Sequence, residues 1–212
     1  QQTYGGWAFG NGRRGLGFSL GVYSAGGLET RIGPSAEPLG TFSLYEIVSG
    51  LSFSGKFGKR FYAGWSIHVL HETIGPDSAS GISLDFGFLY RSAFEGLTLG
   101  VAYRNLGGTG QLDRESIPLP RILRFGSVLL LGSITGSADF GFISKNWSGF
   151  HLGLEYSMEQ TLFLRTGYKS GHETRDFSFG IGLQRRNLRI DYAYVPTALD
   201  LGGSHRIALG IR

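Results

Sequence analysis

The stretch FSFGIGLQRRNLRIDYAYVP, residues 177–196, alternates apolar with small or polar residues on both sides of its central QRRN. The apolar series is Phe177, Phe179, Ile181, Leu183, Leu188, Ile190, Tyr192 and Tyr194. Between them stand Ser178, Gly180, Gly182, Gln184, Arg189 and Asp191. Side chains two residues apart in a strand share a face, so the stretch predicts a β-hairpin with one apolar and one polar face. Both a half-buried sheet and the wall of a membrane barrel have this pattern.

The composition favours a pleated all-β chain. Glycine makes up 36 of the 212 residues, more than twice the usual ~7 %, and aromatic residues make up 14 %. Disordered segments are poor in aromatic residues, so disorder is not indicated. The absence of cysteine excludes disulfides and thiol chemistry. The net charge is +4, and the sequence contains no long basic run, so we expect no nucleic-acid partner.

Period-two alternation recurs along the chain and predicts thirteen strands. They are 2–10, 15–25, 41–54, 60–74, 79–91, 96–106, 121–131, 134–143, 149–158, 161–169, 175–184, 187–195 and 203–212. Globular strands usually have about five or six residues, whereas a strand tilted across a bilayer needs about nine to eleven. The lengths therefore favour a membrane barrel. The longest apolar run, near 128–132, is far shorter than the ~18 residues of a membrane helix.

The connections between these segments alternate in length. Short ones (GNGRR, GKFGK, SAFEG, GS, SMEQT and QRRN) alternate with longer or more polar ones such as GGLETRIGPSAEPLG, GGTGQLDRESIPLP, SKNWSG and PTALDLGG, with GPDS intermediate. Bacterial outer-membrane barrels have short periplasmic turns and longer extracellular loops. The sequence thus predicts a transmembrane antiparallel up-and-down β-barrel, a single domain over 1–212, in the outer membrane. A soluble β-sandwich or a lipocalin-type barrel is the alternative.

In such a barrel the apolar series faces lipid and the polar series faces the lumen. The charged residues expected in the lumen are Glu46, His68, Glu72, Asp85, Arg104, Arg124, His151, Glu155, Arg165, Arg189, Asp191 and Arg206. Pairing offsets the cost of removing charges from water. We therefore expect each of four arginines to lie close to Glu46, Asp85, Glu155 or Asp191; the four are Arg104, Arg124, Arg165 and Arg189. We also expect His68 to pair with Glu72.

Several stretches resemble the PorV/PorQ family of outer-membrane proteins, which belong to the barrels similar to the long-chain fatty acid transporter FadL. They are SASGISLDFGFLYR (78–91), LTLGVAYRNLG (97–107), IPLPRILRFG (117–126), LFLRTGYKSG (162–171) and LRIDYAYVPTALDLGGSHRIALGIR (188–212). The last is the most specific. The resemblance covers about four fifths of the chain, from near Phe42 onward.

This resemblance implies a 14-stranded barrel, of which thirteen strands are visible. The family's signal peptide and its Asn-Pro-Ala-Gly segment, which forms the first strand and part of the lumen filling, are not found in this sequence. Both termini of such barrels lie in the periplasm, which requires an even number of strands. We therefore expect one N-terminal strand or plug segment to be missing. The chain ends on Arg212, where the family typically ends on phenylalanine.

No catalytic or metal-binding pattern is convincing, so we expect no enzyme activity, cofactor or metal. GFSLG at 17–21 matches a nucleophile-elbow string, but that elbow requires a strand-to-helix turn. In HVLHE, at 68–72, a strand places His68 and Glu72 on one face and His71 on the other. At most two ligands then converge, fewer than a zinc site uses.

Three functions fit this protein. The first is an accessory barrel of a secretion or surface-attachment system, as PorV and PorQ are in type IX secretion, which binds protein through extracellular loops 26–40 and 107–120. The second is FadL-like transport of a small hydrophobic molecule, with a lumen site lined partly by Phe163, Leu70 and Leu89. The third is a structural barrel without cargo. Membrane lipid and lipopolysaccharide are the expected surroundings, and the sequence does not separate the first two functions.

Overall fold

The computed structural model describes residues 1–31, 33–34, 37–112, 115–116, 118–171, 177–197 and 202–211. The chain forms two compact units. Unit 1 comprises Gln1–Phe88 with Ala102–Ile122, and unit 2 comprises Leu89–Val101 with Leu123–Arg212.

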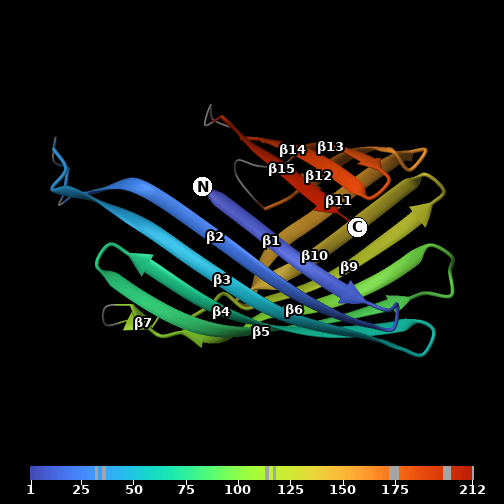
Figure 1. The fold of residues 1–212 in the computed structure, drawn as a ribbon, viewed down its shortest axis with the longest axis horizontal. Coiled ribbons are helices and arrows are strands. Elements are labelled where there is room, and N and C mark those ends of the chain that lie inside the picture. Colours follow the sequence, from blue (N-terminus) through green and yellow to red (C-terminus); the bar gives the residue numbers. More distant parts are fainter. Residues whose placement is uncertain are drawn as a thin grey trace. The chain divides into compact units, whose positions relative to one another are not determined.

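Among the described residues, thirteen antiparallel strands follow one another in chain order in one up-and-down sheet, which confirms the predicted number and order (Figure 1). Their bounds are β1 Gln2–Gly10, β2 Arg14–Thr30, β3 Gly40–Phe57, β4 Phe61–Ile74, β5 Asp77–Arg91, β6 Leu97–Thr109, β9 Ile122–Leu131, β10 Ile134–Ile143, β11 Asn146–Met158, β12 Leu162–Lys169, β13 Phe177–Arg185, β14 Leu188–Pro196 and β15 Gly203–Ile211. A separate pair, β7 Gln111–Leu112 and β8 Glu115–Ser116, was not predicted. Among the described residues the structure has no helix that could cross a membrane.

The hairpin β13–β14 has the two faces predicted for residues 177–196. Ile181 lies opposite Tyr192, and Gly182 lies opposite Asp191. Directly opposed residues in an antiparallel pair share a face, so the apolar residues of both strands gather on one side. The turn consists of Arg186 and Asn187, and Arg186 has a positive φ of 53°. The same alternation of faces continues from β10 to β15, with one register shift between Phe140 and Phe142, so unit 2 has one apolar and one polar face.

Unit 1 is organised in the same way. Phe53 lies opposite both Leu16 and Trp65 on the apolar face. On the polar face Gly50 lies opposite both Ser19 and His68. The polar face is therefore rich in glycine, serine and charged residues.

Two connections differ from the predicted alternation of lengths. The turn between β4 and β5 is Gly75–Pro76, and the turn between β10 and β11 is Ser144–Lys145. The second was expected to be long, because SKNWSG reads as a loop. Instead β11 begins at Asn146, since Ser144 and Lys145 both adopt positive φ angles of 49° and 76° and close a tight hairpin. The connection-length pattern is therefore less regular than the sequence indicates.

The apolar face of each unit is exposed rather than packed into a core. Ala79 is the sole buried hydrophobic side chain among the described residues. Large apolar side chains such as Trp65, Leu154 and Phe179 are 44 %, 51 % and 52 % exposed. A soluble monomer rarely leaves an apolar surface of this extent uncovered.

Candidate functional site

The charged side chains of the polar face form three clusters, one in unit 1 and two in unit 2. Cluster A consists of His68, Asp85 and Arg104. Cluster B consists of Arg124, Asp139 and His151. Cluster C consists of Glu155, Arg165, Arg189 and Asp191.

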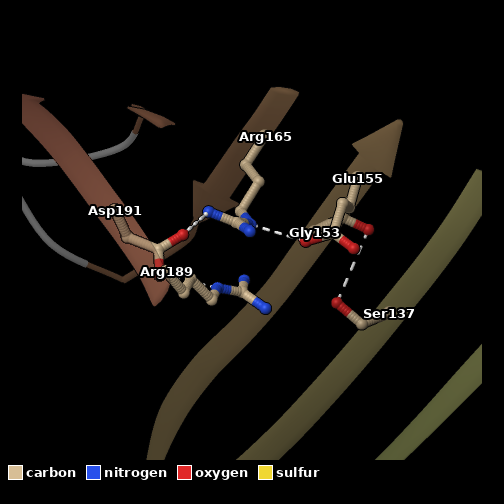
Figure 2. Close-up of polar contacts among 6 residues, drawn as sticks. All are labelled: Ser137, Gly153, Glu155, Arg165, Arg189 and Asp191. Carbon is tan, nitrogen blue, oxygen red and sulfur yellow. Dashed lines mark hydrogen bonds and ion pairs between the residues drawn. The ribbon is translucent and has the colours of Figure 1, made fainter. Parts of the chain in front are cut away.

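Cluster C is the most extensive of the three, and Figure 2 shows it in detail. Arg165 donates from Nε to Glu155 at 2.5 Å and from Nη1 to Asp191 at 2.6 Å. Arg189 donates from Nε to the other oxygen of Asp191 at 2.7 Å. The register explains this arrangement, because Glu155 lies directly opposite Arg165 on neighbouring strands. Two guanidinium and two carboxylate groups make the cluster formally neutral.

Phe163 lies beneath both arginines of cluster C. The Cζ atoms of Arg165 and Arg189 lie 5.5 Å and 5.0 Å from the centre of its ring. A guanidinium group over an aromatic face is attracted by the ring quadrupole. Phe163 therefore orients the two cations, although the sequence suggested a hydrophobic ligand site for it.

Cluster A centres on Asp85. Its Oδ2 accepts a hydrogen bond from Nε of Arg104 at 3.1 Å and lies 3.4 Å from Nε2 of His68. Its Oδ1 accepts from the backbone N–H of Asn105 at 2.9 Å. The expected pair of His68 with Glu72 is therefore wrong, because β5 brings a carboxylate closer to the imidazole. His71 lies on the opposite face of β4 and contacts Ser80 Oγ at 2.9 Å.

Cluster B differs from the expectation in the partner of Arg124. Nη1 of Arg124 donates to Asp139 at 3.3 Å, and Nδ1 of His151 lies 2.9 Å from the same oxygen. Asp139 lies directly opposite His151 in the register of β10 and β11. Asp139 stands on the predicted polar face but was not among the carboxylates expected to pair with arginine.

Two carboxylates of the predicted set, Glu46 and Glu72, form no ion pair with an arginine among the residues that the structure describes. Glu46 lies directly opposite Glu72 on β3 and β4, and like charges in this position destabilise a sheet. Tyr23 lies on the other side of Glu46. The expectation that Glu46 neutralises an arginine is therefore wrong.

Arg206 lies opposite Ala193 on the polar face and lines a small hollow with Arg165 and Asp191.

The chemistry of these clusters is that of mutual neutralisation. Each arginine of clusters A to C already donates to a carboxylate. Asp85, Asp139 and Asp191 each have at least two donors, and Glu155 accepts from Arg165. Within the described ranges, no group of three or more His, Cys, Asp or Glu side chains could hold a metal ion. The ion pairs of clusters A to C therefore hold the side chains of the polar face in fixed positions.

Glycine makes room for cluster C at one position, which provides a test. A Cβ atom at position 182 would overlap Oδ1 of Asp191 and lie 2.9 Å from Nη1 of Arg165. We expect Gly182→Ala to lower the free energy of unfolding by about 1 to 3 kcal/mol, because the ion pair must shift. The measurement is urea unfolding of the purified protein in detergent or lipid.

Gly180→Ala is the matched control for this substitution. Gly180 lies on the same face of the same strand, and neither glycine has a positive φ. A Cβ there would be 3.4 Å from the Tyr192 carbonyl oxygen and 3.5 Å from Arg165 Cβ, which are ordinary contacts. We expect a change within about 1 kcal/mol. Equal destabilisation by both alanines would contradict the role given to Gly182.

Fold and site together define an all-β chain of thirteen antiparallel up-and-down strands, with an exposed apolar face and a polar face ordered by ion pairs. No family model matches this chain, and no curated protein matches it either.

Proposed function

We propose that this protein is a bacterial outer-membrane β-barrel, similar to PorV and PorQ, that serves as an accessory, protein-binding component of a secretion or surface-attachment system. It has no catalytic role in this proposal. The apolar faces contact lipid and lipopolysaccharide, and the ion-paired faces line the lumen. The sequence resemblance supports this assignment together with the observations below.

The main observation in support of membrane insertion is the exposed apolar face of each unit. Strands of eight to eighteen residues present mostly apolar side chains on that face, and many of these are exposed. Outer-membrane strands alternate in this way between hydrocarbon and lumen. The ion pairs of clusters A to C offset the cost of placing charges on the inner face.

The observation that favours protein binding is a projecting β-ribbon, residues 25–31 with 37–42. Ser24 is hydrogen-bonded to Gln1 and Ser43 to Gly75, and beyond these contacts β2 and β3 pair with each other. Thr30 still lies opposite Gly40, so both ends of the predicted loop 26–40, residues 26–30 and 40, belong to the ribbon strands. Figure 1 shows β2 and β3 extending past β1 and β4. An exposed edge of this kind can bind another chain by strand addition or by its side chains.

The contacts on the polar face argue against transport of a small hydrophobic molecule. Phe163, expected to line a ligand site, is covered by the guanidinium groups of Arg165 and Arg189. A hydrophobic ligand would have to displace charged groups that already have partners, and this displacement costs free energy.

The proposed function is tested by shortening the ribbon. In the variant, residues 26–43 are replaced by Asn-Gly, which closes a two-residue hairpin on the pair Ala25 and Leu44. We expect affinity purification from solubilised outer membrane to recover a stoichiometric large protein with the wild-type chain, and to lose it with the variant.

The control replaces Ser144 and Lys145 by Asn-Gly, which suits their positive φ angles and leaves the ribbon intact. This control should recover the partner as the wild type does. Recovery of a small hydrophobic molecule other than membrane phospholipid, without any protein, by the wild-type chain would instead support transport. Unchanged recovery by the shortened variant would exclude the ribbon as the binding element.

A further inference from the structure

A basic hollow of about 900 Å³ lies where the β1–β2 and β3–β4 turns of unit 1 meet. Its lining combines cationic with aromatic side chains; we call it the turn hollow, and we call its aromatic part the floor. It is lined chiefly by Arg13, Arg14, Lys59, Phe53, Gly55 and Phe57. Cations and aromatic rings therefore meet at a single site at the end of these hairpins, which lie side by side in Figure 1.

Backbone contacts hold the two turns together. The Asn11 side chain accepts hydrogen bonds from the backbone N–H groups of Arg13 and Arg14 at 3.1 Å and 3.0 Å. The backbone N–H of Lys56 donates to the carbonyl of Arg13 at 2.8 Å. The conformation of the turn that contains Arg13 and Arg14 is thus held by contacts of their backbone groups and does not depend on their side chains.

The cations of the turn hollow have no carboxylate partners in the part of the chain that the structure describes. Arg13, Arg14, Lys56 and Lys59 form no ion pair with any other described residue. Lys56 instead lies with its Nζ 5.6 Å from the centre of the Tyr62 ring. This contrasts with the polar face, where the arginines of clusters A to C are neutralised. Uncompensated cations in one place favour an anionic ligand.

The floor of the hollow continues the apolar face. Arg14 lies opposite Gly55, and this register places Arg14 on the same face as Phe53 and Phe57. The two rings are 38 % and 59 % exposed. Gly55 leaves the floor open between them, since a Cβ there would lie 3.3 Å from the Phe57 ring. A ligand that fits both parts has an anionic head next to an apolar body.

We propose that the turn hollow binds the headgroup of an anionic phospholipid, with its phosphate on Arg13, Arg14 and Lys59 and its apolar part along Phe53 and Phe57. This site rests on the proposed membrane insertion and adds to it a lipid-specific contact at the end of the short turns. Guanidinium groups bind phosphate with paired, charge-assisted hydrogen bonds.

The test is retention of phosphatidylglycerol by the full chain, measured by native mass spectrometry in neutral detergent. We expect Arg13→Gln/Arg14→Gln to weaken retention at least about tenfold, because two charge-assisted contacts are lost. Gly55→Leu, which fills the floor without changing charge, should weaken it as well. The matched control is Arg185→Gln/Arg186→Gln, an equally exposed arginine pair at the β13–β14 turn, which should retain the lipid.

Equal loss in both arginine pairs would show a non-specific charge effect and overturn the site. So would equal retention of phosphatidylcholine, or displacement of the lipid by inorganic phosphate. Resistance of each protein to alkaline carbonate extraction from vesicles is measured in parallel. If the wild-type chain resists extraction but the arginine variant retains phosphatidylglycerol normally, the site is wrong while membrane insertion stands; extraction of the wild-type chain itself contradicts insertion.

Discussion

Replacing Arg165 by methionine should lower the free energy of unfolding by about 2 to 4 kcal/mol. Arg165 donates to both Glu155 and Asp191, and the three side chains are only 26 %, 30 % and 28 % exposed. Removing the guanidinium leaves Glu155 without its cation and Asp191 with Arg189 alone, in a partly buried site where an unpaired charge is costly. Methionine keeps much of the apolar stem over Phe163, so the loss reports the charge. Urea unfolding in detergent or lipid is the measurement.

Arg31→Met is the control for this prediction. Arg31 pairs with Glu29 at 2.7 Å, but both side chains are well exposed, at 38 % and 49 %. Exposed ion pairs contribute about 0 to 1 kcal/mol, so we expect a small effect. Adding Glu155→Gln to Arg165→Met should restore part of the lost stability, because one unpaired charge disappears. Similar losses for Arg31→Met and Arg165→Met would mean that cluster C is energetically a surface feature.

Placing an arginine on the apolar face should be comparably damaging when the protein is in a bilayer. Leu154 lies in β11 and is 51 % exposed on that face. If the face contacts hydrocarbon, Leu154→Arg should cost about 2 to 4 kcal/mol near the midplane. In water the same substitution on an exposed position would be nearly neutral. Urea unfolding of protein folded into phosphatidylcholine vesicles distinguishes the two.

Thr135→Arg is the matched control on the adjacent strand. Thr135 lies directly opposite Glu155 on the polar face, where a cation gains a carboxylate neighbour. We expect its effect to stay below about 1 kcal/mol. Should the two arginines have equal effects in vesicles, the apolar face would not be the lipid-facing one.

The strands of this protein were predictable because their signal is local. β10 runs over residues 134–143 and β1 over 2–10, as period-two alternation predicts. Errors occurred where turn geometry decides the boundary. The sequence SKNWSG predicts a loop at Ser144 and Lys145, yet their positive φ angles close a two-residue hairpin. The ribbon end of β2 and β3 was missed because glycine, proline and charged residues dominate it.

The candidate site was predicted by face but only partly by partner. Alternation placed Arg104, Arg165 and Arg189 on the polar face, and each pairs there with an expected carboxylate. Arg124 and Glu46 were assigned wrong neighbours. Partners across strands depend on register, and the sequence of one strand contains no direct record of the residue opposite it.

The sequence by itself determined the all-β class, the order and approximate limits of the thirteen strands, and which residues share a face, since these follow from a two-residue period. Only the tertiary structure decided which charges meet. A shift of two residues between neighbouring strands keeps every side chain on its face but exchanges all its partners. The pairing of Arg165 with Glu155, the contact of Asp85 with His68 and the gathering of Arg13, Arg14 and Lys59 around Phe53 and Phe57 are consequences of that register.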